Sequence, residues 1–491
     1  MTGRSCENAF RRSWVQSVSL DKVADATDGK LAGEWRRRAV SSVGTDTRDL
    51  EGKDLYFALT GPRFDGHAFL DDAARAGARA AVVSARSTLA LDFQNKNPSF
   101  PLVLVRDTLK ALGDLAAFVR SGLDLKAVGI TGTTGKTCTK DFLVSILSRD
   151  NRVCSSERSF NNEVGLPLTI FGAGRKDAFL VVEMGARKPG DIKRLAEIAR
   201  PGTGIITNIG PGHLELFKTQ DAVAKTKSEL ARYLPEDGHL LLNAGDPWTR
   251  RISRETHAAV TRFGRGRGSR YKADHVRLDA GARPSFELCG PGFRLDVNLP
   301  AVGRHQVDNA LAAAACAHLL SSSPASIKVG LEKATLSPWR AECTECDSGY
   351  LVINDAYNAN PRSMEAALRT LAEVGGRRRT IAVLGGMAEL GAASAEYHLE
   401  TGEKAAELDI DVVVTVGRRA RQIAAGAASG GLPKGSVFRC EDADEALRLL
   451  ACIVEPDDVI LVKASRVAGL ESVSESLSSP AFMKRKLVAN V

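Results

Sequence analysis

The stretch Val128-Gly-Ile-Thr-Gly-Thr-Thr-Gly-Lys-Thr-Cys-Thr139 decides the fold of this chain. Its apolar start predicts a short buried strand, and Lys136-Thr137 opens a run, Asp141–Ser148, that has the apolar spacing of a helix. Between them the sequence predicts a tight loop, formed by Gly132, Thr133, Thr134 and Gly135. Strand, glycine loop and helix follow one another as they do at phosphate-binding sites.

The chemistry of this loop suits a nucleoside triphosphate. Glycines let backbone N–H groups approach phosphate oxygens, and the helix dipole favours anions. Lys136 adds a mobile positive charge, and the Thr137 hydroxyl can hold Mg²⁺. The usual motif has a further glycine where this chain has Ile130, so the loop is a shortened variant. We expect it to bind a nucleoside triphosphate.

Length and composition describe a multidomain globular protein. The 491 residues are too many for one core, so about three domains are expected. Apolar content is 44% and charged content 26%, as in ordinary soluble proteins. No apolar run reaches about 18 residues, so no membrane span is expected. Met1–Arg12 is basic without a following apolar segment, which argues against a signal peptide.

Charge and cysteine usage narrow the class of partner. The net charge of +8 is compatible with polyanionic small molecules or weak nucleic-acid contact. Aromatic residues make up only 5% and do not interleave with the basic runs, so no nucleic-acid partner is expected. Nine scattered cysteines suggest a reducing, cytoplasmic location. Cys343 and Cys346 form one CxxC, but nothing nearby completes a zinc site.

The first region, 1–123, contains a predicted strand at Asp54–Leu59, a helix at Ala68–Ala76 and a buried strand at Ala80–Ser84. Arg48 and the loop Gly61–His67 are candidate contacts to a second anionic ligand. The alternative for Arg48 is a surface arginine in a turn.

The middle region, 124–337, alternates apolar runs with helical patterns, which predicts a doubly wound α/β domain. The amides of Asn161 and Asn162 could orient an acyl or sugar group, or simply hold their loop. The strand Ala178–Val182 leads into Glu183, at the edge where open α/β sheets bind ligands. Beside Thr137, that carboxylate could coordinate Mg²⁺.

Other candidates follow in the same region. The strand Gly204–Ile209 leads into a glycine-rich turn with His213, for which we favour a metal or phosphate role. Lys225 and Lys227 lie on the next predicted helix, where lysines are ordinarily solvated. A β-rich insertion is expected to end near Val297. His305 and Asn309 precede the helix Ala310–Leu320 and could cap it or contact a base.

The third region, 338–491, repeats the strand, loop and helix order and predicts a second α/β unit with its own ligand-binding edge. Its strands end at Asp355, at the loop Gly385-Gly-Met-Ala-Glu-Leu-Gly391, and at Lys463. Arg340 stands at the start of this region.

Five separated blocks together resemble the Mur ligase family of ATP-dependent amide-bond-forming enzymes, in the family's order. They are Gly132–Thr137, Glu183-Met-Gly185, Asn208-Ile-Gly-Pro-Gly-His213, Gly303-Arg-His305 with Asn309, and Asp355-Ala-Tyr-Asn-Ala-Asn-Pro361. The resemblance covers nearly the whole chain. It implies an α/β protein of three domains: a UDP-binding domain (1–123), a central doubly wound P-loop ATPase-type sheet (124–337) and a Rossmann-like C-terminal ligase domain (338–491).

Within the family, the chain is similar to the members that join D-alanyl-D-alanine to a UDP-N-acetylmuramoyl tripeptide. The blocks that point there are Phe160-Asn-Asn-Glu-Val-Gly-Leu-Pro167, Tyr357-Asn-Ala-Asn-Pro361 and the loop Gly385–Gly391. The implied reaction forms an acyl phosphate from ATP and the tripeptide carboxylate, which the dipeptide amine then attacks. The open alternatives are a sister ligase that adds a diamino acid to the dipeptide precursor, and a non-catalytic nucleotide-binding subunit.

The resemblance also implies residue roles. Lys136 and the loop amides would hold the β- and γ-phosphates of ATP, and Thr137 with Glu183 would hold one Mg²⁺. His213 and a carbamylated Lys227 would hold a second Mg²⁺. The remaining expected contacts are His305 and Asn309 near adenine, Arg340 and Asp355 at phosphate and ribose, and Thr47, Arg48, Asn161, Asn162, Asn358 and Asn360 at the substrates. Gln306 stands where the family usually has Asn. A cytoplasmic monomer is expected.

Overall fold

A computed structural model describes residues 17–36, 38–50, 54–157, 160–480 and 482. The N-terminal segment that the sequence predicts to lack a signal peptide, Met1–Arg12, is outside these ranges. The described chain divides into two compact units. The first contains the described residues up to Gly129, those of Asn151–Ala186, and Gly190–Thr203. The second contains Ile130–Asp150, Arg187–Pro189 and the described residues from Gly204 onward.

The first unit contains a five-stranded sheet in the order β2-β9-β8-β5-β4. Its strands are β2 (Lys30–Ala32), β4 (Ser42–Gly44), β5 (Asp54–Phe57), β8 (Ala80–Ser84) and β9 (Leu102–Val105). All neighbours pair in parallel except β2 with β9. Buried side chains of the sheet pack against helices α2 (Leu70–Arg75) and α3 (Thr88–Lys96). The predicted strand Ala80–Ser84 is therefore confirmed.

The helix predicted at Ala68–Ala76 is present but begins later than predicted. A 3₁₀ turn, η3 (Gly66–Phe69), comes first, and α2 begins only at Leu70. Asp65 explains the turn, because its carboxylate accepts from the backbone N–H of His67 at 3.0 Å. The His67 ring is buried and accepts from the backbone N–H of Ser84 at 2.9 Å. These bonds hold the backbone in a tighter turn than an α-helix.

Further elements of the first unit are short or lie around this sheet. They are β1 (Val18–Ser19), α1 (Leu20–Thr27), β3 (Ala39–Val40), η2 (Thr47–Asp49), β6 (Thr60–Gly61), β7 (Phe64–Asp65), α4 (Thr108–Ser121), α6 (Gly165–Phe171) and α7 (Asp191–Ala199). The last two helices follow the strands of a second sheet.

That second sheet has six strands in the order β11-β12-β10-β13-β14-β15. They are β10 (Lys126–Thr131), β11 (Val153–Ser155), β12 (Phe179–Glu183), β13 (Thr203–Ile206), β14 (His239–Asn243) and β15 (Ala259–Phe263). From β10 the chain builds two strands on one side and then three on the other, as in a doubly wound fold. The predicted doubly wound sheet is confirmed, and the glycine loop follows β10 at the point where the strand order reverses.

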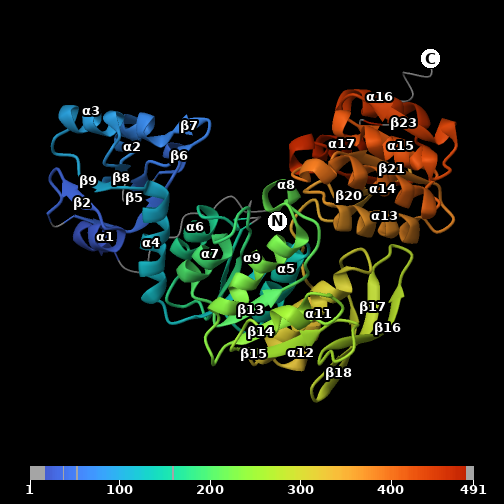
Figure 1. Ribbon diagram of the computed structural model, residues 1–491, viewed down its shortest axis with the longest axis horizontal. Coiled ribbons are helices and arrows are strands. Elements are labelled where there is room, and N and C mark those ends of the chain that lie inside the picture. Colours follow the sequence, from blue (N-terminus) through green and yellow to red (C-terminus); the bar gives the residue numbers. More distant parts are fainter. Residues whose placement is uncertain (1–16, 37, 51–53, 158–159, 481, 483–491) are drawn as a thin grey trace. The chain divides into compact units, whose positions relative to one another are not determined.

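The second unit begins within β10 and continues into α5 (Lys136–Leu147). Its other helices before the C-terminal sheet are α8 (Leu214–Phe217), α9 (Gln220–Tyr233), α10 (Thr249–Ile252), α11 (Gln306–Leu319) and α12 (Pro324–Glu332). Both α11 and α12 pack against α5. The predicted β-rich insertion is confirmed as an antiparallel sheet of β16 (Lys272–Leu278), β17 (Pro284–Gly290) and β18 (Phe293–Asn298), drawn in yellow-green in Figure 1.

The C-terminal part of the second unit is a sheet in the order β19-β20-β24-β21-β22-β23, drawn in orange and red in Figure 1. The strands are β19 (Glu342–Glu345), β20 (Leu351–Asn354), β21 (Thr380–Gly385), β22 (Val412–Val416), β23 (Val437–Cys440) and β24 (Val459–Lys463). Only β19 pairs antiparallel with its neighbour. Because β20, β24 and β21 are adjacent and parallel, their following loops meet at one edge.

Helices cover both faces of this sheet. One face buries apolar side chains against α13 (Pro361–Gly375), α14 (Ser394–Glu407) and α15 (Arg421–Ser429). The other face buries them against α16 (Ala443–Ile453) and α17 (Glu471–Leu477). Within the described ranges, no helix has the length and apolar character that crossing a membrane would require.

Candidate active site

The phosphate loop has a backbone that only glycine adopts easily at two positions. Gly132 has φ +147° and Gly135 has φ +79°. A Cβ at Gly135 would lie 2.3 Å from Asn309 Oδ1, and one at Gly132 would lie 1.9 Å from Thr207 Oγ1. Both conformation and space therefore require glycine here. The short loop keeps its cradle shape because neighbouring side chains pack directly against its backbone.

Asn208 holds this loop in place. Its Oδ1 accepts from the Thr134 N–H and from the Thr134 hydroxyl, both at 3.1 Å, and its Nδ2 donates to the Thr134 carbonyl at 3.1 Å. Thr207 donates to the same carbonyl at 2.6 Å. Thr133 N–H donates to the Asn208 carbonyl at 2.9 Å. The segment after β13 thus fixes the loop after β10.

The cation and hydroxyl of the motif lie at the start of α5. Lys136 Nζ donates to the Gly132 carbonyl at 2.9 Å, so its ammonium lies over the loop. The Thr137 side chain is in the first turn of the helix and is buried. The predicted cradle residues are brought together in one unit, with the helix N-terminus directed at the loop.

The two lysines of α9 have different environments. Lys225 is exposed and pairs with Asp221 at 2.9 Å, as expected of a solvated helix lysine. Lys227 is buried, and burial lowers the pKa of its amine well below the ordinary value, with a smaller contribution from the charge of Lys136. The solvated interpretation therefore holds for Lys225 and is wrong for Lys227.

His213 begins α8 in a left-handed conformation, with φ +54°. Its Nδ1 bonds to a carboxylate oxygen of Glu389, from the loop after β21. The hydrogen bond and charge of His213 lower the pKa of Glu389. The imidazole is thus held from one side through Nδ1.

A buried ammonium organises the loop after β20. Lys463, at the end of β24, pairs with Asp355 Oδ2 at 2.6 Å and donates to the Asn358 carbonyl at 3.0 Å. Its side chain is only 2% exposed. Asn358 itself accepts from the Ala359 N–H through Oδ1. Asn360 caps α13, since its Oδ1 accepts from the Ser363 N–H at 3.0 Å.

Arg340 has a fixed position but, within the described part of the chain, an unused hydrogen-bond donor. Its guanidinium stacks over the Tyr357 ring at 4.2 Å, and its buried Nε has no hydrogen-bond partner among the described residues. The flanking residues Trp339 and Ala341 both have positive φ, at +62° and +55°. A strained backbone around a cation with an unused donor fits an anion-binding role.

The start of α11 contacts the phosphate loop. Burial lowers the pKa of His305, whose ring lies beside Gly303. Asn309 packs against Gly135, and its Nδ2 donates to Gln306 Oε1 at 2.9 Å. Gln306, which stands where the family usually has Asn, is buried, and its hydrogen bond orients Asn309.

The candidate residues of the first unit lie in two places. Glu183 ends β12 and is buried, and Asn161 lies against the following Gly185. Asn162 accepts a hydrogen bond at 2.8 Å from the N–H of Gly165, the first residue of α6.

The other place is η2, which contains Thr47 and Arg48. The Arg48 side chain is 85% exposed and pairs with Asp46 at 2.5 Å. The ligand roles of Thr47, Arg48, Asn161, Asn162 and Glu183 stay predictions, as does a joint site of Glu183 with Lys136 and Thr137.

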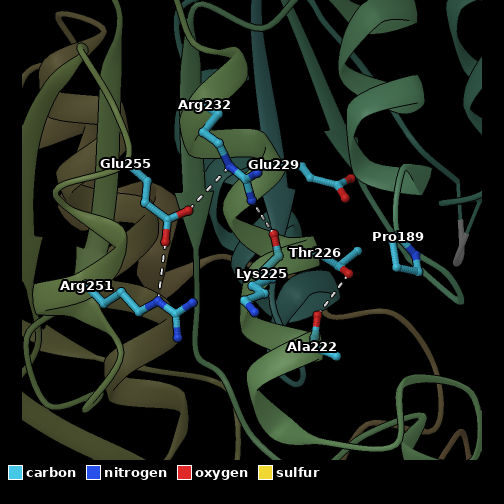
Figure 2. A pocket seen from close by; sticks show the side chains of 8 residues that line it. All are labelled: Pro189, Ala222, Lys225, Thr226, Glu229, Arg232, Arg251 and Glu255. Atoms are coloured by element: carbon cyan, nitrogen blue, oxygen red, sulfur yellow. Dashed lines mark hydrogen bonds and ion pairs between the residues drawn. The ribbon is translucent and has the colours of Figure 1, made fainter.

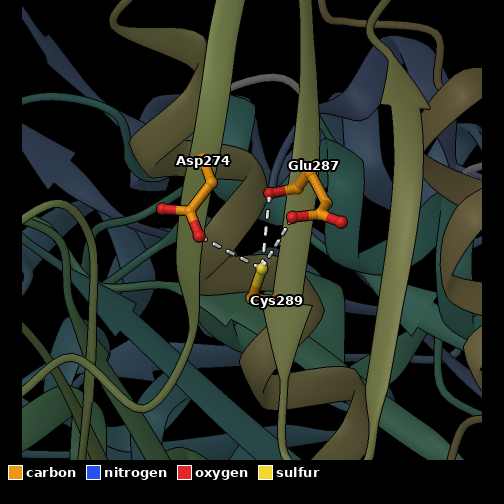
Figure 3. A group of neighbouring side chains, drawn as sticks. All are labelled: Asp274, Glu287 and Cys289. Carbon is orange, nitrogen blue, oxygen red and sulfur yellow. Dashed lines mark hydrogen bonds between the residues drawn. The ribbon is translucent and has the colours of Figure 1, made fainter.

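Two other features of the second unit contain none of the residues for which a ligand role is predicted. A pocket of about 420 Å³ lies along one face of α9 (Figure 2). Beside it, Glu255 pairs with Arg232 at 3.3 Å and with Arg251 at 3.5 Å. Figure 3 shows Asp274 and Glu287 beside the Cys289 thiol, 3.5 Å from each carboxylate. Lys272 and Arg294 neutralise these carboxylates at 2.8 Å. We assign no site to either feature.

Sequence reasoning missed three residues that organise the site. Asn208 and Glu389 stand inside quoted family blocks, but no role was expected for either, and Lys463 was noted only as a strand end. A signal existed in their positions, because Asn208 and Glu389 follow strands and Lys463 ends one, at ligand-binding edges. Their partners lie far away in sequence, so the contacts themselves could not be read from the chain.

Three family models match consecutive parts of the chain. The Mur ligase family catalytic domain matches residues 39–120, the Mur ligase middle domain 130–317, and the Mur ligase glutamate ligase domain 339–466. The predicted fold class of three α/β domains is thus confirmed. The boundaries 1–123, 124–337 and 338–491 stay predictions.

Individual relatives match over nearly the full length. UDP-N-acetylmuramoyl-tripeptide–D-alanyl-D-alanine ligase of Mycobacterium tuberculosis is 37% identical, covering 94% of this chain and 97% of the relative. A crystal structure of MurF from Acinetobacter baumannii has a TM-score of 0.85 at 29% identity, and the match covers 94% of this chain and 99% of that one. The structure of MurF ligase from Thermotoga maritima in complex with ADP has a TM-score of 0.78 at 27% identity, and the match covers 92% of this chain and 98% of that one. The chain therefore belongs to the Mur ligase family.

Proposed function

We propose that this protein is an ATP-dependent amide-bond ligase that joins D-alanyl-D-alanine to UDP-N-acetylmuramoyl-tripeptide in peptidoglycan precursor synthesis. The observation that carries the proposal is the full-length match to ligases named for this reaction, at 37% identity. The phosphate loop agrees with it, because its glycines, Lys136 and Thr137 form the cradle that a triphosphate needs.

ATP activates the carboxylate by transferring its γ-phosphoryl group, and the substrates supply both the nucleophiles and the leaving group. The protein therefore contributes positioning and charge neutralisation. Lys136 and the loop N–H groups bind the β- and γ-phosphates. Arg340 offers its unused guanidinium donor to a phosphate oxygen, and Asp355, held by Lys463, accepts from the ribose.

The residues also fit magnesium. Thr137 offers a hydroxyl, Glu183 a carboxylate, and His213 the ring nitrogen opposite the one bound to Glu389. Lys227 suits carbamylation, because its burial favours the neutral amine that reacts with CO₂. Two bound Mg²⁺ ions would neutralise the charge that develops on the transferred phosphoryl group. Asn161, Asn162, Asn358 and Asn360, with Thr47 and Arg48, are our candidates for the peptide and UDP contacts.

We place the reaction in the cytoplasm, with the protein acting as a monomer. These two assignments rest on the family resemblance and on cysteine usage.

The deciding experiment measures phosphate release and product mass with purified protein, ATP and Mg²⁺. UDP-N-acetylmuramoyl-tripeptide with D-alanyl-D-alanine should give the amide product. The dipeptide precursor with meso-diaminopimelate or lysine should give none. Preferential reaction with a diamino acid would assign the protein to a sister ligase, and no turnover with any pair would support a non-catalytic subunit.

The Lys136→Ala variant tests the phosphate cradle. We expect turnover to fall at least about 10²-fold, the scale of losing one donor to the transition state. Lys434→Ala, which changes an exposed lysine of the second unit, is the matched control and should keep parental turnover. Equal turnover of both variants would refute the role of Lys136.

A further inference from the structure

We propose that Glu389 is a positioning residue that fixes the ring orientation and tautomer of His213, so that Nε2 is presented to the metal. This inference rests on the metal role proposed above for His213. It adds a residue from the last sheet, beyond the ligands themselves, to the organisation of the metal site.

The first observation is the bond between the two side chains. A carboxylate can only accept, so His213 Nδ1 must carry the proton that it donates to Glu389. A neutral ring with Nδ1–H leaves its lone pair on Nε2. In water the neutral histidine side chain favours the opposite tautomer, with the proton on Nε2, so a fixed acceptor at Nδ1 is required to hold this one. Carboxylates that bind the far nitrogen of a metal-binding histidine act in this way.

The second observation is that the backbones dock as well as the side chains. The Glu215 N–H donates to the Glu389 carbonyl at 2.9 Å. At Gly391, whose φ is +60°, a Cβ would lie 3.0 Å from the Glu215 Cα. The turn after β21 therefore lies directly against the turn that contains His213, and the carboxylate does not reach His213 from a freely moving loop.

The third observation is backbone conformation at both partners. His213 and Glu389 are both non-glycine residues in the left-handed region, with φ of +54° and +61°. Such conformations cost free energy and persist where surrounding contacts over-determine them. Here the two strained residues, His213 and Glu389, are the ones whose side chains bond to each other. We infer that the contact between the two turns maintains both strained conformations.

Glu389 also interacts with Arg187, at 3.8 Å. That arginine is 76% exposed, so the pair is weak. The carboxylate is 32% exposed, and of its two partners, Arg187 and His213, the closer is His213. The position of the Glu389 carboxylate therefore suits it best for orienting the imidazole of His213.

The test compares Glu389→Ala, Glu389→Gln and His213→Gln with the parent. Glu403→Gln, an exposed carboxylate on α14, is the matched control. The first measurement uses ¹⁵N-histidine NMR on metal-free protein, with the His213 signal assigned by its loss in His213→Gln. We expect the Nδ1–H tautomer in the parent and in Glu403→Gln, and a mixture of tautomers in Glu389→Ala.

The second measurement titrates Mn²⁺ into the protein–ADP complex and follows free Mn²⁺ by electron paramagnetic resonance. Glu389→Ala should weaken Mn²⁺ binding about 10-fold or more, the usual scale for losing such a partner. Glu389→Gln should lie between alanine and parent, because its amide oxygen still accepts from Nδ1. Melting curves establish that each variant is folded.

An unchanged tautomer in folded Glu389→Ala, or unchanged Mn²⁺ affinity, would overturn the inference. The proposed function fails differently. If the parent shows no ligase turnover, the proposed function is wrong, while the tautomer measurement still decides whether Glu389 positions His213.

Discussion

The ion pair of Lys463 and Asp355 illustrates how single residues hold this site. The ammonium is almost fully buried, and its three donors reach the Asp355 carboxylate and two backbone carbonyls of the same loop. A buried charge is tolerated when its hydrogen bonds are satisfied. Lys463 therefore fixes the loop that carries Asp355 and Asn358, without needing to touch a substrate.

We predict that Lys463→Met lowers the free energy of unfolding by about 3 kcal/mol, because it leaves a carboxylate and two carbonyls without their donor. Chemical unfolding in urea measures this change. Adding Asp355→Asn should cost less than the sum of the single changes, since the two residues interact directly.

Lys225→Met is the control, because its ion pair with Asp221 is exposed and should contribute within about 0.5 kcal/mol. Equal losses for Lys463→Met and Lys225→Met would contradict the organising role of Lys463.

At the scale of elements, α14 and α15 approach each other unusually closely. A Cβ at Gly402 would lie 1.9 Å from the Ile423 carbonyl oxygen, and one at Gly426 would lie 2.0 Å from the Leu399 carbonyl oxygen. Both glycines are thus required by space, and their helical conformations need no special φ. The close crossing lets both helices cover the same face of the C-terminal sheet.

We predict that Gly402→Ala destabilises the protein by about 2 kcal/mol. Alanine favours a helix by about 1 kcal/mol over glycine, but the added methyl group would overlap backbone atoms of α15, which cannot rotate away. Thermal unfolding measures the change. Gly435→Ala provides the control, since nothing lies within 4 Å of its Cβ position. A Gly402→Ala variant as stable as the parent would show that the two helices separate easily.

At the scale of the whole molecule, the chain forms two compact units, and the phosphate loop belongs to the second. Within that unit the loop receives contacts from the segment after β13 and from the start of α11. We therefore expect a ligand in the cradle to contact several elements that are distant in sequence, and its binding to stabilise much of that unit.

We predict that ADP with Mg²⁺ raises the melting temperature of the protein. Ligand at 100 times its dissociation constant contributes about 2.7 kcal/mol to the folded state. Differential scanning fluorimetry measures the shift. Lys136→Ala should reduce it, whereas Lys434→Ala should retain it. A full shift in Lys136→Ala would place the nucleotide elsewhere.

Local patterns along the chain were enough to predict the architecture of this protein and the location of its phosphate loop. Apolar runs and glycine turns are local signals, so β8 was predicted at its observed bounds. The order of family blocks identified three α/β domains. The helix that Lys136-Thr137 was predicted to open does begin at Lys136, where glycine ends the loop.

The contacts between side chains of the site are visible only in the folded protein. Glu389 lies 176 residues from His213, and Lys463 lies 108 residues from Asp355. Lys225 and Lys227 look alike in the sequence, yet one is solvated and the other buried with a lowered pKa. The physical reason is that burial and pairing depend on contacts between distant elements, which local spacing does not encode.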